Sequence, residues 1–488
     1  MLFPFTKYGQ GTYTNKSIHL KKCKMADGTD VMADFSTLPD VVWVRILQYL
    51  PLRDRQEVAS TCHLLHDAFN HPSLWRRQVL TFIGDKDNSS RKGIPVYPAR
   101  HNMELTKQFG QYFQDLTIRV ISHFRTMNSD LRELLVQVAE NCRLESLTLD
   151  IGKQTSQFHK RYGFPPDPNA IATLETFVKT AFRMKHLAIM SWPMFKDKNE
   201  SLFMALKSNE KLRDNLESMT LFWLDGAEWS EREPLLLSAD DTVDLVRHFP
   251  YLTCLGLRSP MVNNGLLEML AETSRAKLRT LKLVIHYLWQ KRNFAVPQIE
   301  QKSWTALLNR NPDFRVEVTV FLATPTMELA SMLTPEAPVS YFRFIKYSKL
   351  ESSSLVKIYT QYSGTLTTFH SLCDSYEMDS ELILLCEKCE LLTDLIYHGE
   401  IYVNTVKCIS KSRGRKWKRF ELKDSSIKIH TEFDNIDNDL VLQRNEQGEL
   451  IQLRLQRFLA TDDEQLRTMR EEVSSAIGEP WKPTVVKS

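Results

Sequence analysis

The stretch STLPDVVWVRILQYLPLRDRQEVASTCHLLHDAFNHPSLWRR, residues 36–77, predicts a compact group of short helices. Its first part, residues 38–50, is rich in apolar side chains at roughly helical spacing, and Pro39 stands where the first turn of a helix tolerates proline. Pro51 ends that helix, and a regular apolar spacing predicts a second helix over residues 54–69. A unit of about forty residues buries little surface alone, so apolar residues left exposed on it indicate a partner.

The order and spacing of these residues resemble an F-box. The positions that coincide with the family pattern are Leu38-Pro39, Ile46-Leu47, Leu50-Pro51-Leu52, Asp54, Val58-Ala59, Cys62, Pro72 and Leu74-Trp75. The sequence departs from the pattern at His63-Leu64-Leu65, where the family more often has a basic residue and an aromatic one. The resemblance implies docking on a Skp-family adaptor and, through it, on a cullin–RING ubiquitin ligase. The alternative is a plain three-helix linker with a core of its own.

On this resemblance we expect one surface of the helical group to bind the adaptor. The residues expected in it are Leu38, Pro39, Val42, Ile46, Leu47, Leu50 and Pro51. Each well-buried aliphatic side chain in such a surface contributes about 1.5–3 kcal/mol of transfer free energy. The cost of association is subtracted from that sum.

Composition limits the remaining possibilities. The 488 residues allow more than one domain, and a net charge of +3 gives no reason to expect a membrane or nucleic-acid partner. No apolar run approaches the length that crosses a bilayer, and the N-terminal residues lack the apolar core of a signal peptide. Because the eight cysteines are scattered, we expect a reducing compartment, cytoplasmic or nuclear.

A short pattern recurs between residues 113 and 422: an apolar residue, two others, an apolar residue, one other, and a third apolar residue. It begins at Phe113, Leu144, Met184, Leu216, Leu252, Leu278, Val339, Leu392 and Trp417, with looser copies at Phe314 and Leu366. Chance alone produces many such patterns, so their spacing of about 24 to 40 residues matters more. LESLTL and LESMTL, at Leu144 and Leu216, are nearly identical, and helix-like stretches separate the copies.

A strand and a returning helix, restarted every thirty or so residues, predict a parallel solenoid. The repeats resemble a divergent leucine-rich-repeat domain. The Asn or Cys that the family carries after the last strand leucine is absent; Gly152, Trp192, Leu224, Pro260 and His286 stand there. The predicted fold class is therefore α/β: an N-terminal three-helix F-box, then an irregular leucine-rich-repeat solenoid with parallel strands on the concave side and helices outside.

This fold class divides the chain into five expected segments. They are a flexible basic arm (1–33), the F-box (34–80), a linker (81–105), the solenoid (106–430) and a C-terminal cap and tail (431–488). The last segment is expected to hold one charged helix, followed by a loose tail over EPWKPTVVKS.

The sequence carries no phosphate-binding loop, nucleophile elbow or HExxH motif, so we expect no catalytic residue, no cofactor and no enzyme activity. Cys386 and Cys389 form the only CxxC; without further ligands we expect no metal and place both in the core. The basic run at 411–419 could bind an acidic or phosphorylated partner or a nucleic acid. We favour a solvated turn whose Trp417 and Phe420 face the core.

Solenoids normally bind through the concave strand face and its adjoining loops. The substrate-binding residues expected there are Thr148, Trp192, Thr220, Trp223, Lys282 and Arg343. The resemblance implies a substrate-recognition subunit of an SCF-type (Skp–cullin–F-box) ubiquitin ligase, which holds a protein substrate by proximity and performs no bond chemistry. The alternatives are a non-ligase interaction scaffold and a nucleic-acid-associated protein.

Overall fold

The computed structural model describes residues 38–82, 99–120, 124–151, 168–191, 196–222, 237–286, 298–321, 329, 331–346, 348–429 and 464–485. The chain divides into two compact units, residues 1–74 and 75–488. The basic arm at 1–33, most of the expected linker, and two expected site residues, Trp192 and Trp223, lie outside the described residues.

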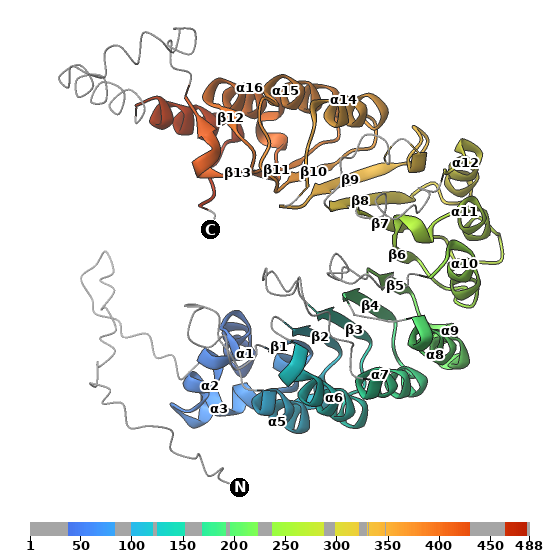
Figure 1. Ribbon diagram of the computed structural model, residues 1–488. Coiled ribbons are helices and arrows are strands. Elements are labelled where there is room, and N and C mark those ends of the chain that lie inside the picture. The colour runs from blue at the N-terminus through green and yellow to red at the C-terminus, as the bar shows by residue number, and fades with distance from the viewer. Residues whose placement is uncertain are drawn as a thin grey trace, which may run out of the picture. The chain divides into compact units, whose positions relative to one another are not determined.

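The first unit is a group of short helices. They are α1 (Asp40–Tyr49), α2 (Leu52–Ala59) and α3 (His63–Asn70), with α4 (Pro72–Trp75) at its boundary (Figure 1). Prolines stand at the N-caps of α1 and α2, and α3 packs against both helices. Arg55 Nε donates to the carbonyl oxygen of Leu50 at 2.8 Å, which holds the end of α1 beside α2.

The single helix expected over residues 54–69 is two helices, so that prediction was wrong. Ser60 Oγ donates to the carbonyl of Glu57 at 2.6 Å, and Thr61 Oγ1 donates to that of Val58 at 2.7 Å. Such side chains compete with helical hydrogen bonding. Cys62 then adopts an extended backbone, with φ of −158°, and becomes the N-cap of α3.

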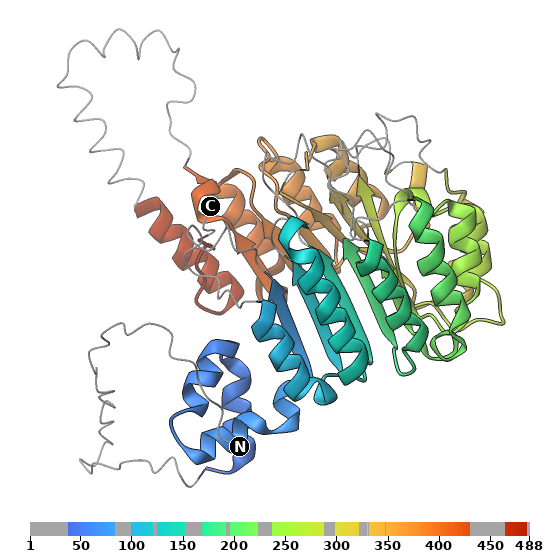
Figure 2. The same cartoon turned by 60° about the horizontal axis from the view of Figure 1, so that its bottom comes forward.

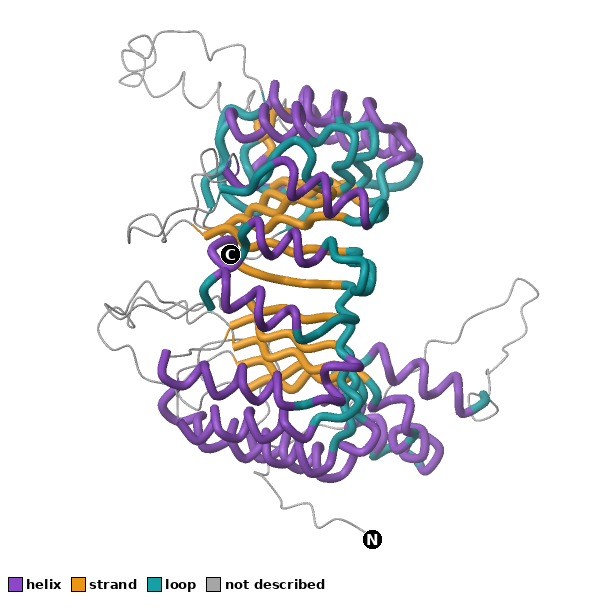
Figure 3. Tube along the Cα trace, turned by 90° about the vertical axis from the view of Figure 1, so that its right-hand side faces the viewer, coloured by secondary structure: helices purple, strands orange, loops and turns teal. Residues whose placement is uncertain are grey.

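The second unit contains a sheet of 12 parallel strands in sequence order. The strands are β1 (Arg77–Phe82), β2 (Asp115–Val120), β3 (Ser146–Ile151), β4 (His186–Ser191), β5 (Ser218–Leu221), β6 (Cys254–Arg258), β7 (Thr280–His286), β8 (Arg315–Phe321), β9 (Val339–Phe344), β10 (Thr368–Ser371), β11 (Asp394–Tyr397) and β13 (Arg419–Leu422). A small second sheet pairs β12 (Ile401–Tyr402) with β14 (Ile427–Lys428). Figure 3 shows the strands side by side in one layer.

Helices alternate with these strands and lie on the outer side of the layer (Figure 1). They are α5 (Ala99–Phe109), α6 (Phe124–Asn141), α7 (Pro168–Thr180), α8 (Lys196–Ser208), α9 (Glu210–Asn215), α10 (Ala239–Arg247), α11 (Asn264–Leu270), α12 (Gln301–Arg310), α14 (Ser352–Gln361), α15 (Asp379–Lys388) and α16 (Val403–Arg413). Parallel strands on the inner side and helices outside are the predicted solenoid, so the fold class is confirmed.

The recurring apolar pattern forms the core between strands and helices. At β3, for example, Leu147 and Leu149 of the strand and Leu144 just before it are all buried, and Leu147 pairs in register with Leu187 of β4. The pattern located every strand of the large sheet except β1. There the middle position is Gln78, which pairs with Leu116 and is buried despite its polarity.

Side chains that reach back to the preceding repeat bond the carbonyls at the end of its helix. Asn209 donates its Nδ2 hydrogens to the carbonyls of Val178 and Ala181, at the end of α7, both at 2.7 Å. Arg275 donates to the carbonyls of Val246 and Phe249, at the end of α10, at 2.9 and 2.7 Å.

Two more arginines repeat this arrangement: Arg310 reaches the carbonyl of Thr273 after α11, and Arg413 reaches that of Cys389 after α15. We call Asn209, Arg275, Arg310 and Arg413 the inter-repeat caps. The carbonyls at a helix C-terminus have no partner within their helix and carry partial negative charge, which favours amide and guanidinium donors there.

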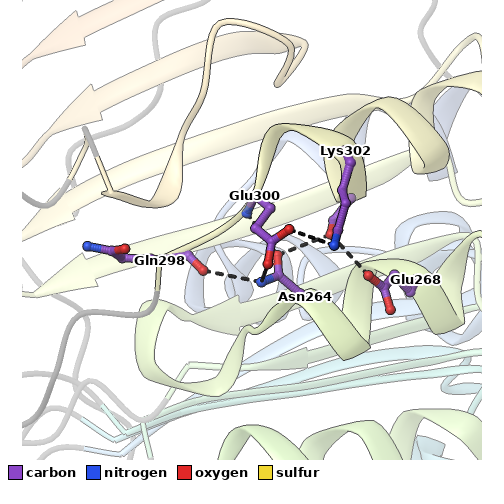
Figure 4. A network of polar contacts seen from close by, with 6 residues as sticks. Asn264, Glu268, Gln298, Glu300 and Lys302 are labelled. Carbon is purple, nitrogen blue, oxygen red and sulfur yellow. Dashed lines mark hydrogen bonds and ion pairs between the residues drawn. The ribbon is translucent and has the colours of Figure 1, made fainter.

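A polar network also joins neighbouring helices at their N-terminal ends (Figure 4). Asn264 Oδ1, on α11, accepts a hydrogen bond from the backbone N–H of Glu300 at 2.8 Å and from Ser303 Oγ at 3.1 Å. Lys302 pairs with Glu300 at 2.7 Å. The network fixes the start of α12 against α11.

The C-terminal segment covers the end of the sheet. Residues 464–477 form the expected charged helix, which lies against α16 through ion pairs of Glu472 with Lys407 and Lys411 (Figure 2, dark red). The expected loose tail is ordered as far as residue 485, so that prediction was wrong. Trp481 Nε1 donates to the carbonyl of Phe420 at 2.8 Å, and Thr484 N–H donates to that of Leu422 at 2.7 Å. These bonds cover the last strand.

Candidate functional site

The first candidate surface lies on α1 and its flanking prolines. Six of the seven expected adaptor-binding residues keep exposed surface: Pro39, Ile46 and Pro51 are exposed, and Leu38, Val42 and Leu50 are half-buried. Leu47 differs, because none of its surface is exposed. Together with Val44 it forms the buried side of α1, so its place in the docking surface is corrected to a place in the core.

Sequence reasoning missed two residues of this surface. Val41 is 71% exposed and Tyr49 is 80% exposed, although both are large and apolar. The signal was present, since α1 has more apolar residues than one buried face of a short helix can use. An exposed apolar face on so small a unit is the feature that indicates a partner.

The second candidate surface is the concave face of the large sheet. Thr148, Ala188, Thr220, Gly256 and Lys282 stand opposite one another on successive strands, so they form one row across β3 to β7. Three expected site residues, Thr148, Thr220 and Lys282, therefore share a row, although Thr220 is buried.

Arg343 belongs to a different row. The register shifts between β8 and β9, so the row that contains Lys282 and Glu317 continues to Tyr341. Arg343, two residues further along β9, stands opposite Thr319 on one side and His370 on the other. The structure thus separates Arg343 from the other expected residues and places it beside β10.

The two halves of the concave face differ in chemistry. From β3 to β6 the shared row carries only small, uncharged residues among those described. Ion pairs of Arg77 with Asp115 and of Arg119 with Asp150 lie at the start of the sheet. In the second half, from β7 onward, the row becomes mainly charged and aromatic, with an ion pair between Lys282 and Glu317 at 3.8 Å and a two-point pair between Arg419 and Glu421 at 3.0 and 3.1 Å.

Tyr341, Arg343 and His370 form a cluster at the centre of that half. The Tyr341 hydroxyl lies 3.1 Å from His370 Nδ1, and Arg343 stands opposite His370 on the neighbouring strand. Burial, together with the charges of Arg419 and Arg343, lowers the pKa of His370 to about 4. The imidazole is therefore neutral at physiological pH.

Three of the six cations in the basic run at 411–419 have partners within the chain. Lys411 pairs with Glu472 at 2.9 Å, Arg413 donates to the carbonyl of Glu390 at 2.9 Å, and Arg419 pairs with a carboxylate on its own strand. Trp417 and Phe420 are buried, as expected for a turn that leads into a repeat strand.

The cysteine pair is also part of the core. Cys386 and Cys389 are fully buried at the end of α15, and burial raises the pKa of the Cys389 thiol to about 12. A thiol with so high a pKa stays protonated, which disfavours both nucleophilic attack and metal binding. Within the described ranges, no group of three or more His, Cys, Asp or Glu residues could hold a metal ion.

The helix face carries one shallow depression of about 380 Å³ between α10 and α11. Its charged lining residues are Asp240, Arg247, Glu268 and Glu272.

None of the helices in the described part of the chain is both long and apolar enough to cross a membrane.

The chain is similar to several known proteins. Residues 35–81 match the family model described as F-box-like. The chain is 22% identical to F-box/LRR-repeat protein 21 of Mus musculus over 377 residues, which are 75% of this chain and 77% of that protein. It is 23% identical to F-box only protein 33 of Homo sapiens over 227 residues, covering 44% of this chain and 36% of that protein. Among solved structures, it is similar to a chain of the crystal structure of the TLR13–ssRNA13 complex, with a TM-score of 0.28, 11% identity, and coverage of 69% of this chain and 53% of that one.

Proposed function

We propose that this chain, an F-box protein with divergent leucine-rich repeats, is the substrate-recognition subunit of an SCF-type ubiquitin ligase. The F-box unit docks a Skp-family adaptor, which connects the chain to a cullin–RING ligase. The repeat unit holds a protein substrate on its concave face. The chain contributes proximity, because a substrate held beside the loaded conjugating enzyme experiences a raised effective concentration.

The observation that carries the proposal is the exposed apolar face of α1. Val44 and Leu47 already provide its buried side, yet Val41, Ile46 and Tyr49 leave large apolar surfaces exposed. Exposed prolines flank this face at both ends of the helix. A unit of this size gains nothing from such exposure unless a partner covers it.

The expected adaptor contacts are Leu38, Pro39, Val42, Ile46, Leu50 and Pro51, with Val41 and Tyr49 added to them. Each aliphatic side chain that the partner covers contributes about 1.5–3 kcal/mol, which corresponds to roughly ten- to hundredfold in affinity. A charge placed among them adds the cost of burying an unpaired carboxylate.

The test is co-expression with a Skp-type adaptor and size-exclusion chromatography of wild type, Ile46→Glu and Met204→Glu. Ile46 is 41% exposed on α1, and Met204 is an exposed apolar residue of α8 in the other unit, which makes it a matched control. We expect co-elution for wild type and Met204→Glu, and loss of co-elution for Ile46→Glu with an unchanged circular dichroism spectrum.

Two results would contradict the proposal. One is a folded wild-type chain that does not co-elute with the adaptor, which favours a non-ligase interaction scaffold. The other is an Ile46→Glu variant that co-elutes as well as wild type, which removes α1 from the docking surface.

A further inference from the structure

The cations of the large sheet follow a pattern that singles out Arg343. Most exposed strand cations pair with a carboxylate: Arg77 with Asp115, Arg119 with Asp150, Lys282 with Glu317, and Arg419 with Glu421. In the described strands, Arg315 and Arg343 are exposed and have no such pair. Arg315 opens β8 and stands opposite Thr280, away from the Tyr341 cluster, whereas Arg343 lies within it.

The hydrogen bond of the cluster has a definite direction. A phenol hydroxyl is a stronger donor than a neutral imidazole, and an imidazole nitrogen is a stronger acceptor than a phenol oxygen. The Tyr341 hydroxyl therefore donates to His370 Nδ1, 3.1 Å away. Because the imidazole of His370 is neutral, accepting at Nδ1 places its proton on Nε2.

This hydrogen bond leaves a donor without an acceptor. His370 Nε2 is buried and has no hydrogen-bond partner. An unfilled donor of this kind costs about 1–3 kcal/mol, and few exist in folded proteins. Nε2 is buried, so a ligand oxygen reaches it only when neighbouring side chains change rotamer, which is a fast motion.

The ligand that best complements this cluster is an anion of single charge. An anionic oxygen would accept hydrogen bonds from both the guanidinium of Arg343, which has no carboxylate partner, and the Nε2–H of His370. A phosphate dianion fits less well, because phosphate sites normally gather several cations. Here Arg419 is already engaged by Glu421, and Asp394 is a second carboxylate that acts on His370.

We propose that the concave face at β9 and β10 binds an acidic segment of a partner protein, with a Glu or Asp carboxylate seated on Arg343 beside Tyr341 and His370. This inference rests on the proposed function, because it names the chemical class of substrate segment that the repeat unit holds. Arg343 is the charged contact, and the hydrogen-bonded pair of Tyr341 and His370 lies beside it.

The test uses the full chain and three fluorescein-labelled ten-residue peptides, each acetylated and amidated. One alternates Glu with Ser and Gly, the second has Gln at every Glu position, and the third has phosphoserine at those positions. Fluorescence anisotropy gives the affinity for wild type, Arg343→Gln, Arg343→Lys and Arg315→Gln. Arg315 is the matched control, an exposed and unpaired arginine on a neighbouring strand.

We expect wild type to prefer the Glu peptide over the Gln peptide. Arg343→Gln lowers affinity for the Glu peptide on the order of tenfold, as for a charge-assisted hydrogen bond. Arg343→Lys recovers part of the loss, and Arg315→Gln changes affinity less than twofold.

Three results would overturn the inference: equal binding of the Glu and Gln peptides, equal losses in Arg343→Gln and Arg315→Gln, or Arg343-dependent binding of the phosphoserine peptide more than tenfold tighter than the Glu peptide. Adaptor co-elution, measured on the same samples, separates the two proposals. Intact co-elution without peptide preference refutes the acidic segment alone, and the reverse refutes the ligase role alone.

Discussion

Replacing Arg275 by Met tests whether the inter-repeat caps hold the repeat unit together. Arg275 is almost fully buried, and its guanidinium donates to the carbonyls of Val246, Arg247 and Phe249 at 2.9, 3.3 and 2.7 Å. Methionine keeps an unbranched apolar stem of similar length, so the variant removes the charge and the hydrogen bonds but little of the packing.

The expected loss of stability follows from these bonds. Hydrogen bonds to a charged group each contribute about 1.5–3 kcal/mol, and the variant also leaves helix-end carbonyls without partners. Burial lowers the pKa of Arg275, which shows that desolvation of the guanidinium offsets part of this gain. The net effect is about 2–4 kcal/mol for the contacts at 2.9 and 2.7 Å, with little from the longest one.

The assay is urea unfolding followed by far-ultraviolet circular dichroism, combined with hydrogen–deuterium exchange of the native protein. Exchange localises the effect, which we expect at the end of α10 and in α11. The control is Arg247→Met, which removes an exposed arginine from the same helix end and should change the free energy of unfolding by less than about 0.5 kcal/mol. Equal stability of the two variants, with unchanged protection of α10, would refute the reasoning.

Two further predictions concern the concave face. Gly256→Ala would place a Cβ 2.8 Å from two side-chain atoms of Thr220, so we expect a loss of about 1–3 kcal/mol in urea unfolding, whereas Gly364→Ala, with nothing within 4 Å, should be neutral or slightly stabilising. A larger loss of stability for Gly364→Ala than for Gly256→Ala would contradict this expectation and show that the strands relax around the methyl group added at Gly256. The pKa of His370 falls from 6.5 to about 4 on folding, so the unfolded chain binds this proton first as pH decreases. His370 should therefore make stability fall between pH 6.5 and about 4, and His370→Gln should flatten that dependence; an unchanged slope would contradict the burial of a neutral imidazole.

Much of the fold was predictable, because parallel strands buried on their helix side repeat a simple apolar pattern. The pattern failed at β1, where Gln78 takes the place of an apolar residue and nothing local shows that it will be buried. It also hid the break between α2 and α3, because Val58, Cys62, Leu65 and Phe69 keep a helical spacing across it. The ordering of the tail depends on Trp481 meeting Phe420, a contact between residues far apart in the chain.

The candidate surfaces were predictable in kind but not in detail. Family positions located the docking surface on α1, but only packing shows that Leu47 faces inward. Alternation along β9 predicted that Arg343 faces out. Its grouping with Tyr341 and His370 depends on the register between β9 and β10, which no local pattern encodes.

The inter-repeat caps all have the same polarity along the chain, and this sets the order in which the repeats complete their hydrogen bonds during synthesis. In each case the donor, such as Asn209 or Arg413, belongs to a later part of the chain than the carbonyls it satisfies. During synthesis from the N-terminus, each such helix acquires its last hydrogen bonds only when the next repeat has left the ribosome. A pause or premature stop within the array therefore leaves the newest complete helix unfinished, while earlier repeats are already closed. If repeats are lost from the N-terminal side, the cap side chain of the first remaining repeat has no carbonyl to bond. It then lies at the surface, where water satisfies its hydrogen bonds at little cost.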